Sequence, residues 1–139
     1  YTRTVLSIDE SVEFYITESW LNINPPNTYH HRHNHSNSIV SGVYYIDVGE
    51  DSEITFCTQN TMPITSNPSY SIPVKEYNLA NSSFWTCPVN DNGIIYFPST
   101  TLHEVGTNNS DKNRISLGFN VFMRGELGDT KNLNLLQLG

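Results

Sequence analysis

Short apolar or alternating segments of four to nine residues constrain this sequence more than any other feature. Their length and period are typical of β-strands. Gly, Pro, Asn and Asp separate them, and the run Asn90–Gly93 predicts a hairpin turn. Many short strands between turns predict an all-β sandwich or barrel, with a short helix or strand at residues 133–138. The expected strands are Val12–Ile16, Trp20–Ile23, Ile39–Ile46, Glu53–Cys57, Ser83–Thr86, Ile94–Phe97 and Ile115–Met123.

The composition agrees with strands and turns rather than long helices. Charged residues make up only 15% of the chain, against about 25% in a typical domain. Tyr and Phe number 8 and 6, and both are common in strands. A length of 139 residues fits one domain. We expect residues 1–139 to be a single domain that forms the C-terminal part or core of a slightly longer chain.

The charge and the cysteines exclude some classes of partner. A net charge of −7 with only 7 Lys and Arg argues against a nucleic-acid binder that relies on phosphate contacts. No apolar run approaches the 18 residues of a membrane span. Cys57 and Cys87 do not make a disulfide framework, which favours a reducing compartment. We therefore expect a cytoplasmic protein with neither nucleic acid nor membrane as its partner.

The most informative segment is the histidine-rich run of residues 30–35, which holds four of the five histidines. Side chains alternate along an extended strand, so His31, His33 and His35 would share one face and His30 the other. Two imidazoles at i and i+2 can bind one metal ion, and the fifth histidine, His103, follows a later apolar segment. Neutral imidazoles suit iron, zinc, copper and nickel. The alternative is a solvated histidine run without a metal.

The segment from Arg114 to Val121 alternates cleanly between two kinds of side chain. Its apolar row is expected to face the core, and the opposite row begins with Arg114 and Ser116. A cationic group that faces a pocket needs a partner, and a ligand carboxylate would supply one through a bidentate contact. The alternative is an Arg that extends to solvent or pairs with a protein carboxylate. The apolar row is Ile115, Leu117, Phe119 and Val121, and the other row is Arg114, Ser116, Gly118 and Asn120.

The ordered set of these residues resembles the iron(II)- and 2-oxoglutarate-dependent oxygenases. More narrowly, it is similar to a family of such oxygenases found in marine bacteria and their phages. The resemblance implies a double-stranded β-helix, a cupin-like jelly roll, over residues 1–139, and a host-cytoplasm location if a phage encodes the chain. It runs from about Trp20 to Phe122. The motifs that carry it are Glu18–Asn22, His33–Ser38, Ser41–Tyr45, Phe97–Ser99 and Arg114–Asn120.

The resemblance also implies roles for individual residues. His33, His35 and His103 would hold Fe(II). Arg114, helped by Ser116, would pair with the distal carboxylate of the cosubstrate 2-oxoglutarate. Tyr45 falls in a Tyr-Tyr pair similar to one that contacts the cosubstrate in prolyl-hydroxylase-like enzymes. The expected activity is a dioxygenase that couples oxidative decarboxylation of 2-oxoglutarate to oxidation of a C–H bond.

Two features of the histidine run depart from a simple match. Most of the superfamily has Asp or Glu two residues after the first ligand His, and this chain has His35 there. Three neutral imidazoles leave the full +2 charge on the metal. The ligand pair is also open between His31 with His33 and His33 with His35, because strand periodicity alone does not separate them. The spacing from His35 to Tyr45 matches the family and favours the second pair.

Two other functions compete with this one. A cupin enzyme without 2-oxoglutarate would need Glu four residues past the His-x-His pair, where this chain has Ile39. A non-catalytic jelly-roll binding or structural module would suit the many Asn, Ser, Thr and Tyr residues. The oxygenase would take 2-oxoglutarate and O2, with a further substrate that the sequence does not name. Unpaired sheet edges leave a homodimer open.

Three segments are expected to surround the pocket. Trp20 and Asn22 precede the histidine run and are expected to line it. The stretches Met62–Tyr70 and Asn24–Tyr29 are expected to cover its mouth, because long loops in compact domains are often functional.

Overall fold

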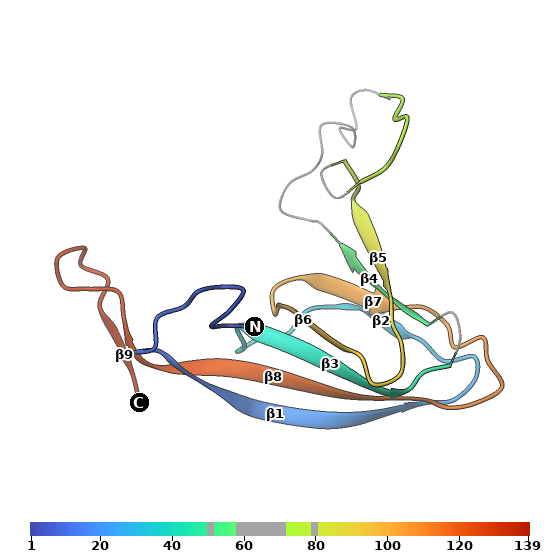
Figure 1. The fold of residues 1–139 in the computed structure, drawn as a ribbon, viewed down its shortest axis with the longest axis horizontal. Coiled ribbons are helices and arrows are strands. Elements are labelled where there is room, and N and C mark those ends of the chain that lie inside the picture. The colour runs from blue at the N-terminus through green and yellow to red at the C-terminus, as the bar shows by residue number, and fades with distance from the viewer. Residues whose placement is uncertain (50–51, 58–71, 79–80) are drawn as a thin grey trace.

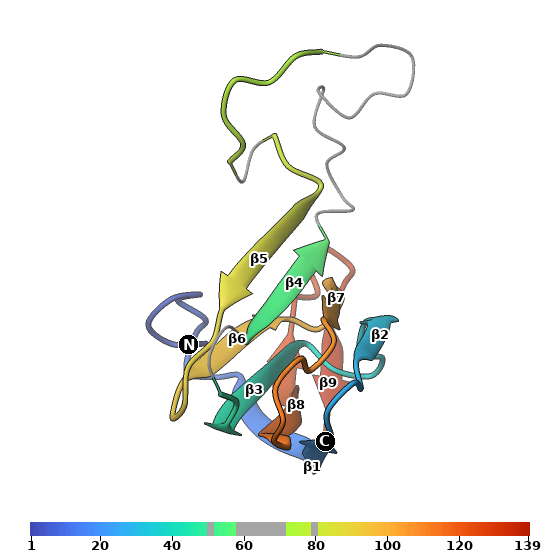
Figure 2. The same cartoon turned by 90° about the vertical axis from the view of Figure 1, so that its right-hand side faces the viewer.

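The computed structural model describes residues 1–49, 52–57, 72–78 and 81–139, which form two antiparallel sheets and, among these residues, no helix. Figures 1 and 2 show the sheets packed face to face, with β4 and β5 projecting beyond the rest. The five-stranded sheet has the order β1 (Glu13–Asn24), β8 (Arg114–Leu127), β3 (Val40–Asp47) and β6 (Ile94–Pro98), and β9 (Leu136–Leu138) pairs with β8. The four-stranded sheet has the order β2 (His30–His33), β7 (Leu102–Val105), β4 (Glu53–Cys57) and β5 (Phe84–Pro88).

The all-β jelly roll predicted from the sequence is confirmed, and most strands lie where they were expected. The segment Glu53–Cys57 is β4 without any change in its bounds. The two segments expected within residues 12–23 form one long strand, β1, whose pairing with β8 shifts between Ile16 and Glu18. One extra residue there interrupts the alternation, which is why the sequence suggested two strands. The leucine-rich tail forms a strand, β9, rather than a helix. In the described part of the chain, no helix is long and apolar enough to cross a membrane.

The turn at Asn90–Gly93 is present, but the predicted hairpin is wrong. The amide of Gly93 donates to the carbonyl of Asn90 at 3.0 Å, as in a tight turn. The flanking strands β5 and β6 belong to different sheets and do not pair. The turn instead carries the chain across the core, and it is held because the amide of Asn92 donates to the carbonyl of Tyr45 at 2.8 Å. Turn residues identify a reversal of the chain but not the partner of the next strand.

The expected orientation of β8 is wrong, because its polar row is buried and its apolar row is the more exposed. Alternation shows that the two faces of a strand differ, but it does not show which face meets the second sheet. In this fold the polar row lies between the sheets, where it borders a pocket and a network of buried hydroxyl groups. The buried row is Arg114, Ser116, Gly118 and Asn120, and the half-buried row is Ile115, Leu117, Phe119 and Val121.

The apolar core between the sheets is small. Its buried residues come from both sheets and from the connections between them. Gly118 lies beside the pocket and leaves room for Trp20, since a Cβ atom at this position would lie 2.5 Å from the Trp20 indole. The predicted covering loop Met62–Tyr70 lies outside the described residues. The buried core consists of Tyr45, Val48, Ile54, Val89 and Phe97.

This arrangement predicts unequal costs for two similar substitutions. Ile54 is 1% exposed between the sheets, whereas Leu21 is 55% exposed on β1. We expect Ile54→Ala to lower the free energy of unfolding by about 3 kcal/mol, because it leaves a cavity. Leu21→Ala should change it by about 0.5 kcal/mol or less. Urea denaturation of both variants measures the difference, and equal losses would contradict the orientation of the sheets.

Candidate metal centre and adjoining pocket

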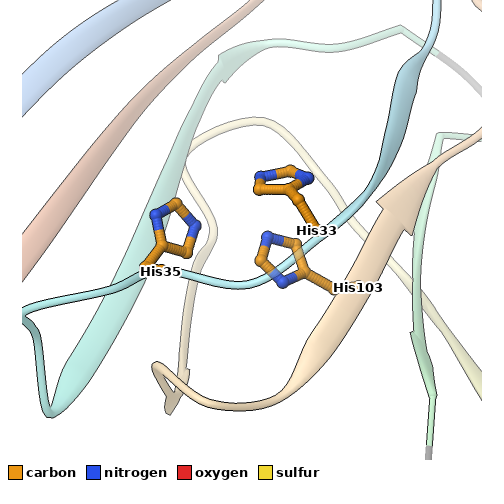
Figure 3. A group of neighbouring side chains, drawn as sticks. All are labelled: His33, His35 and His103. Carbon is orange, nitrogen blue, oxygen red and sulfur yellow. The ribbon is translucent and has the colours of Figure 1, made fainter.

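Three histidines, two from neighbouring strands and one from the loop after β2, converge between the sheets. His33 ends β2, His35 lies two residues further on, and His103 lies on β7 directly opposite His33 in the strand pairing. One ring nitrogen of each residue lies within 4.8 Å of the other two. Figure 3 shows the three rings turned toward a common space. His103 is 3% exposed, whereas His33 and His35 are half-buried, so the cluster extends from the interior toward the surface.

Hydrogen bonds to the main chain fix the tautomers of two of these rings. Nδ1 of His33 contacts the carbonyl of His31 at 2.7 Å, and Nδ1 of His103 contacts the carbonyl of Thr101 at 3.0 Å. A carbonyl oxygen only accepts, so each Nδ1 must carry the proton and donate it. The lone pair of each ring therefore lies on Nε2. Metal-binding histidines usually donate a hydrogen bond in this way from the ring nitrogen that does not bind the metal.

The surroundings of His103 and His35 favour the neutral form of these two rings. Burial lowers the pKa of His103 to about 4, although its hydrogen bond to Thr101 acts in the opposite direction. Burial also lowers the pKa of His35, and the neighbouring His33 adds to this effect. Metal ions bind the neutral imidazole, so these two rings do not have to release a proton before they bind a metal.

Arg114 lies at the first position of β8 and borders the same pocket. It is 7% exposed, and its Nη2 atom donates to the carbonyl of Gly106 at 3.2 Å. Burial lowers the pKa of Arg114, but an arginine keeps its charge in proteins. Among the described residues, no carboxylate pairs with it and no acidic side chain lines the pocket. The pocket therefore holds a desolvated positive charge that lacks an anionic partner.

Tyr45 and Ser116 lie opposite each other on β3 and β8, and both border this pocket. The hydroxyl of Tyr45 is buried and has no hydrogen-bond partner in the described part of the chain. Burial raises the pKa of Tyr45 above its usual value, and the charge of Arg114 only partly opposes this. The phenol therefore stays protonated and is free to donate a hydrogen bond.

The structure separates the histidines differently from the strand alternation predicted in the sequence. His31 is exposed, and His30 lines the pocket with His33 and His35. The pairing of β2 with β7 shifts by one residue between His30 and His33. The extra residue in such a bulge allows His30 and His33 to face the same side, although an odd number of positions separates them. Of the two ligand pairs left open, the structure brings together His33 and His35.

Other pocket residues escaped the sequence analysis. The amide Nδ2 of Asn24 donates to Nε2 of His30 at 2.7 Å, which fixes that ring in the wall of the pocket. Burial lowers the pKa of His30, and the charge of Arg114 adds to this. The two residues predicted to line the pocket, Trp20 and Asn22, do so. Local sequence gave no signal for the apolar lining residues Val43, Ile54 and Val105.

A family model described as "Putative 2OG-Fe(II) oxygenase" matches residues 18–120. This span covers most of the chain and includes the three histidines, Tyr45 and Arg114. The chain belongs to this 2OG-Fe(II) oxygenase family. The description of this family names Fe(II) and 2-oxoglutarate.

Two solved structures are similar to this family member. An oxidoreductase of the 2OG-Fe(II) oxygenase family from Burkholderia pseudomallei has a TM-score of 0.59 and 14% identity, over 79% of this chain and 45% of that one. A prolyl-4-hydroxylase from Pseudomonas putida has a TM-score of 0.48 and 18% identity, over 79% of this chain and 54% of that one. The chain spans about half the length of these two proteins. The first likeness shows the fold. No curated protein matches the sequence.

The donor groups fit the metal and the cosubstrate of the family. Three imidazoles with free Nε2 lone pairs are suitable ligands for iron(II). Arg114 and Tyr45 fit a carboxylate, because among the described residues the buried guanidinium has no anionic partner and the buried hydroxyl has no hydrogen-bond partner. Both kinds of group border one pocket.

Substitution of single histidines tests the metal site. We expect His33→Ala, His35→Ala and His103→Ala each to weaken Co²⁺ binding by more than about 100-fold. This loss exceeds the usual cost of removing a group that only hydrogen-bonds to a metal ligand. His31→Ala is the matched control, since it keeps the carbonyl that holds His33 and should change the affinity less than about twofold. Absorption titration with Co²⁺ measures the affinities. A large loss with His31→Ala would contradict this ligand set.

Proposed function

We propose that this chain is a dioxygenase that oxidises a C–H bond of its substrate while 2-oxoglutarate is converted to succinate and carbon dioxide. The observation that supports this best is the position of a desolvated, unpaired Arg114 in the same pocket as three convergent imidazoles. A metal site alone would not need this arginine. A diacid that binds the metal at one end and the guanidinium at the other uses both.

The three histidines would hold iron(II) through Nε2. When bound, iron(II) supplies the redox chemistry by which O2 oxidises both 2-oxoglutarate and the C–H bond of the substrate. The main-chain carbonyls of His31 and Thr101 keep the Nδ1 protons of His33 and His103 in place, so these two rings do not rotate away from the ion. Three neutral ligands would leave the full +2 charge of iron(II), which an anionic cosubstrate would offset.

Arg114, Tyr45 and Ser116 would bind the distal carboxylate of 2-oxoglutarate. The guanidinium supplies the charge and a planar pair of donors, which suits a carboxylate in two-point contact. The Tyr45 hydroxyl would donate a further hydrogen bond, and Ser116 lies directly across from it. The lowered polarity of the site strengthens these contacts, because Arg114 and Tyr45 are both buried.

Apolar side chains would exclude water from the space between the two anchoring points. Val43, Ile54 and Val105 come from different strands and complete the pocket wall. Trp20 lies over Gly118, and its ring centroid is 5.5 Å from that of His35. Exclusion of water protects a reactive site from side reactions and strengthens its electrostatic contacts. Asn24, from the stretch expected to cover the mouth, also lines this wall.

Loss of the guanidinium should abolish use of the cosubstrate while leaving the metal bound. We expect Arg114→Met to weaken 2-oxoglutarate binding by about 100-fold or more, since breaking a buried charge pair costs about 3–5 kcal/mol. Calorimetry with the Mn²⁺-loaded protein measures the affinity, and iron-dependent release of succinate without added substrate measures turnover. Arg124→Met is the control, because Arg124 is exposed and pairs with Glu13. Metal binding that is indifferent to 2-oxoglutarate would support a cupin enzyme or a binding module instead.

A smaller change tests the tyrosine. Tyr45→Phe removes only the hydroxyl, so we expect 2-oxoglutarate to bind about fivefold more weakly, as for the loss of one hydrogen bond. The same calorimetric titration applies. Because the hydroxyl has no partner within the described protein, the variant should be at least as stable as the wild type in urea. A destabilised Tyr45→Phe with unchanged affinity would show that the hydroxyl serves the fold and not the ligand.

A further inference from the structure

Ser99 is 0% exposed in the connection between β6 and β7, and it belongs to a chain of buried hydroxyl groups. Its Oγ atom lies 2.7 Å from Oγ of Ser38 and 2.8 Å from Oγ of Ser41. Oγ of Ser41 in turn donates to Oδ1 of Asn120 at 2.8 Å. Four polar side chains from three segments of the sequence therefore form one network.

The direction of two hydrogen bonds in this network is fixed. The Oδ1 atom of Asn120 only accepts, so the one hydroxyl proton of Ser41 is donated there. Ser41 therefore accepts the proton of Ser99. The proton of Ser38 has three acceptors within reach, which are Oγ of Ser99 and the carbonyls of Val40 and Val121. Removal of the Ser99 hydroxyl would leave Ser41 without its buried donor, whereas Ser38 would still reach the two carbonyls.

Ser99 also holds the loop that carries His35. The amide of His35 donates to the carbonyl of Ser99 at 2.9 Å, and the amide of Ser99 donates to the carbonyl of Ile39 at 3.0 Å. With the contact from Ser38, three hydrogen bonds join Ser99 to residues 35–39. His35 lies beyond the end of β2, so strand pairing does not place it. Its main chain depends on these contacts with Ser99.

The same connection supports a second ligand. The amide of Thr101 donates to the carbonyl of Pro98 at 2.9 Å, which closes a turn around Ser99. The carbonyl of Thr101 accepts the Nδ1 proton of His103. The main chain of this one turn thus contacts the main chain of His35 and the side chain of His103.

We propose that Ser99 is a positioning residue of the metal centre, which sets the distance between His35 and His103 through the Ser38–Ser99–Ser41–Asn120 network. This inference rests on the proposed metal site and extends it to residues that do not touch the ion. Hydroxyl groups at this place make the turn rigid, because a turn held only by main-chain bonds can shift when the metal is absent. The network therefore prepares the three-histidine geometry before the ion binds, which lowers the cost of binding.

The test measures Co²⁺ affinity and the Co²⁺ ligand-field spectrum of the whole chain. We expect Ser99→Ala to weaken Co²⁺ binding about 10-fold or more and to alter the spectrum. Losses of this size follow when a residue that supports a metal ligand is removed. Ser41→Ala, which removes the acceptor of the Ser99 proton, should weaken it about threefold. Ser99→Cys keeps a side-chain donor that is weaker and somewhat larger than the hydroxyl, and it serves as the second variant if Ser99→Ala does not fold. Ser52→Ala is the matched control, because Ser52 donates to the carbonyl of Val48 outside the pocket and should leave the affinity unchanged.

A double-mutant cycle separates positioning from a general effect on stability. In the background of His35→Ala, Ser99→Ala should cost less than about twofold in Co²⁺ affinity, because the ligand that Ser99 positions is gone. An equal loss in both backgrounds would assign Ser99 a merely structural role and overturn the proposal. Unchanged affinity and spectrum in Ser99→Ala would overturn it as well. If the wild-type chain does not bind Co²⁺, the metal site itself fails, and that outcome is distinct from the other two.

Discussion

Placing a charged guanidinium between two sheets is the physical constraint on which the site depends. Desolvation of Arg114 is costly, and one hydrogen bond to the carbonyl of Gly106 satisfies only part of its donor capacity. A protein that needed Arg114 only for stability would gain from an acidic partner, and the described residues place none in the pocket. The partner that we propose for it is a carboxylate of the cosubstrate. The hydroxyl of Tyr45 is similar, since it too is buried and finds no hydrogen-bond partner among the residues that the structure describes.

The metal centre depends on strand register rather than on local sequence. His33 and His103 meet because β2 and β7 pair with these two residues opposite each other. The bulge before His33 turns His30 into the pocket wall and leaves His31 in solvent. His35 lies outside any strand and is held by the Ser99 turn. Two ligands are therefore placed by a sheet and the third by a loop, so the third is the one whose position most needs additional support.

The sequence predicted the components of the structure better than their orientation. Strand-length periodicity gave the all-β class and the segment that forms β4, because burial of one sheet face leaves a local pattern. It failed at β8, where the polar row faces inward, since a pocket lined by Arg114 reverses the usual relation between polarity and burial. It also failed for His30, because a bulge changes side-chain parity without any mark in the sequence. Position in a pocket depends on pairing between segments far apart in the chain.

The charge balance of the pocket connects the unusual third imidazole with the arginine. A site with two imidazoles and a carboxylate would reduce the +2 charge of iron(II) to +1, whereas His33, His35 and His103 leave it at +2. Arg114 adds a further positive charge, and no acidic side chain of the described residues lines the pocket. A dianionic cosubstrate would offset two of these three charges in surroundings of low polarity, so metal and cosubstrate stabilise each other strongly. In this site the cosubstrate would supply the negative charge that a carboxylate ligand supplies elsewhere.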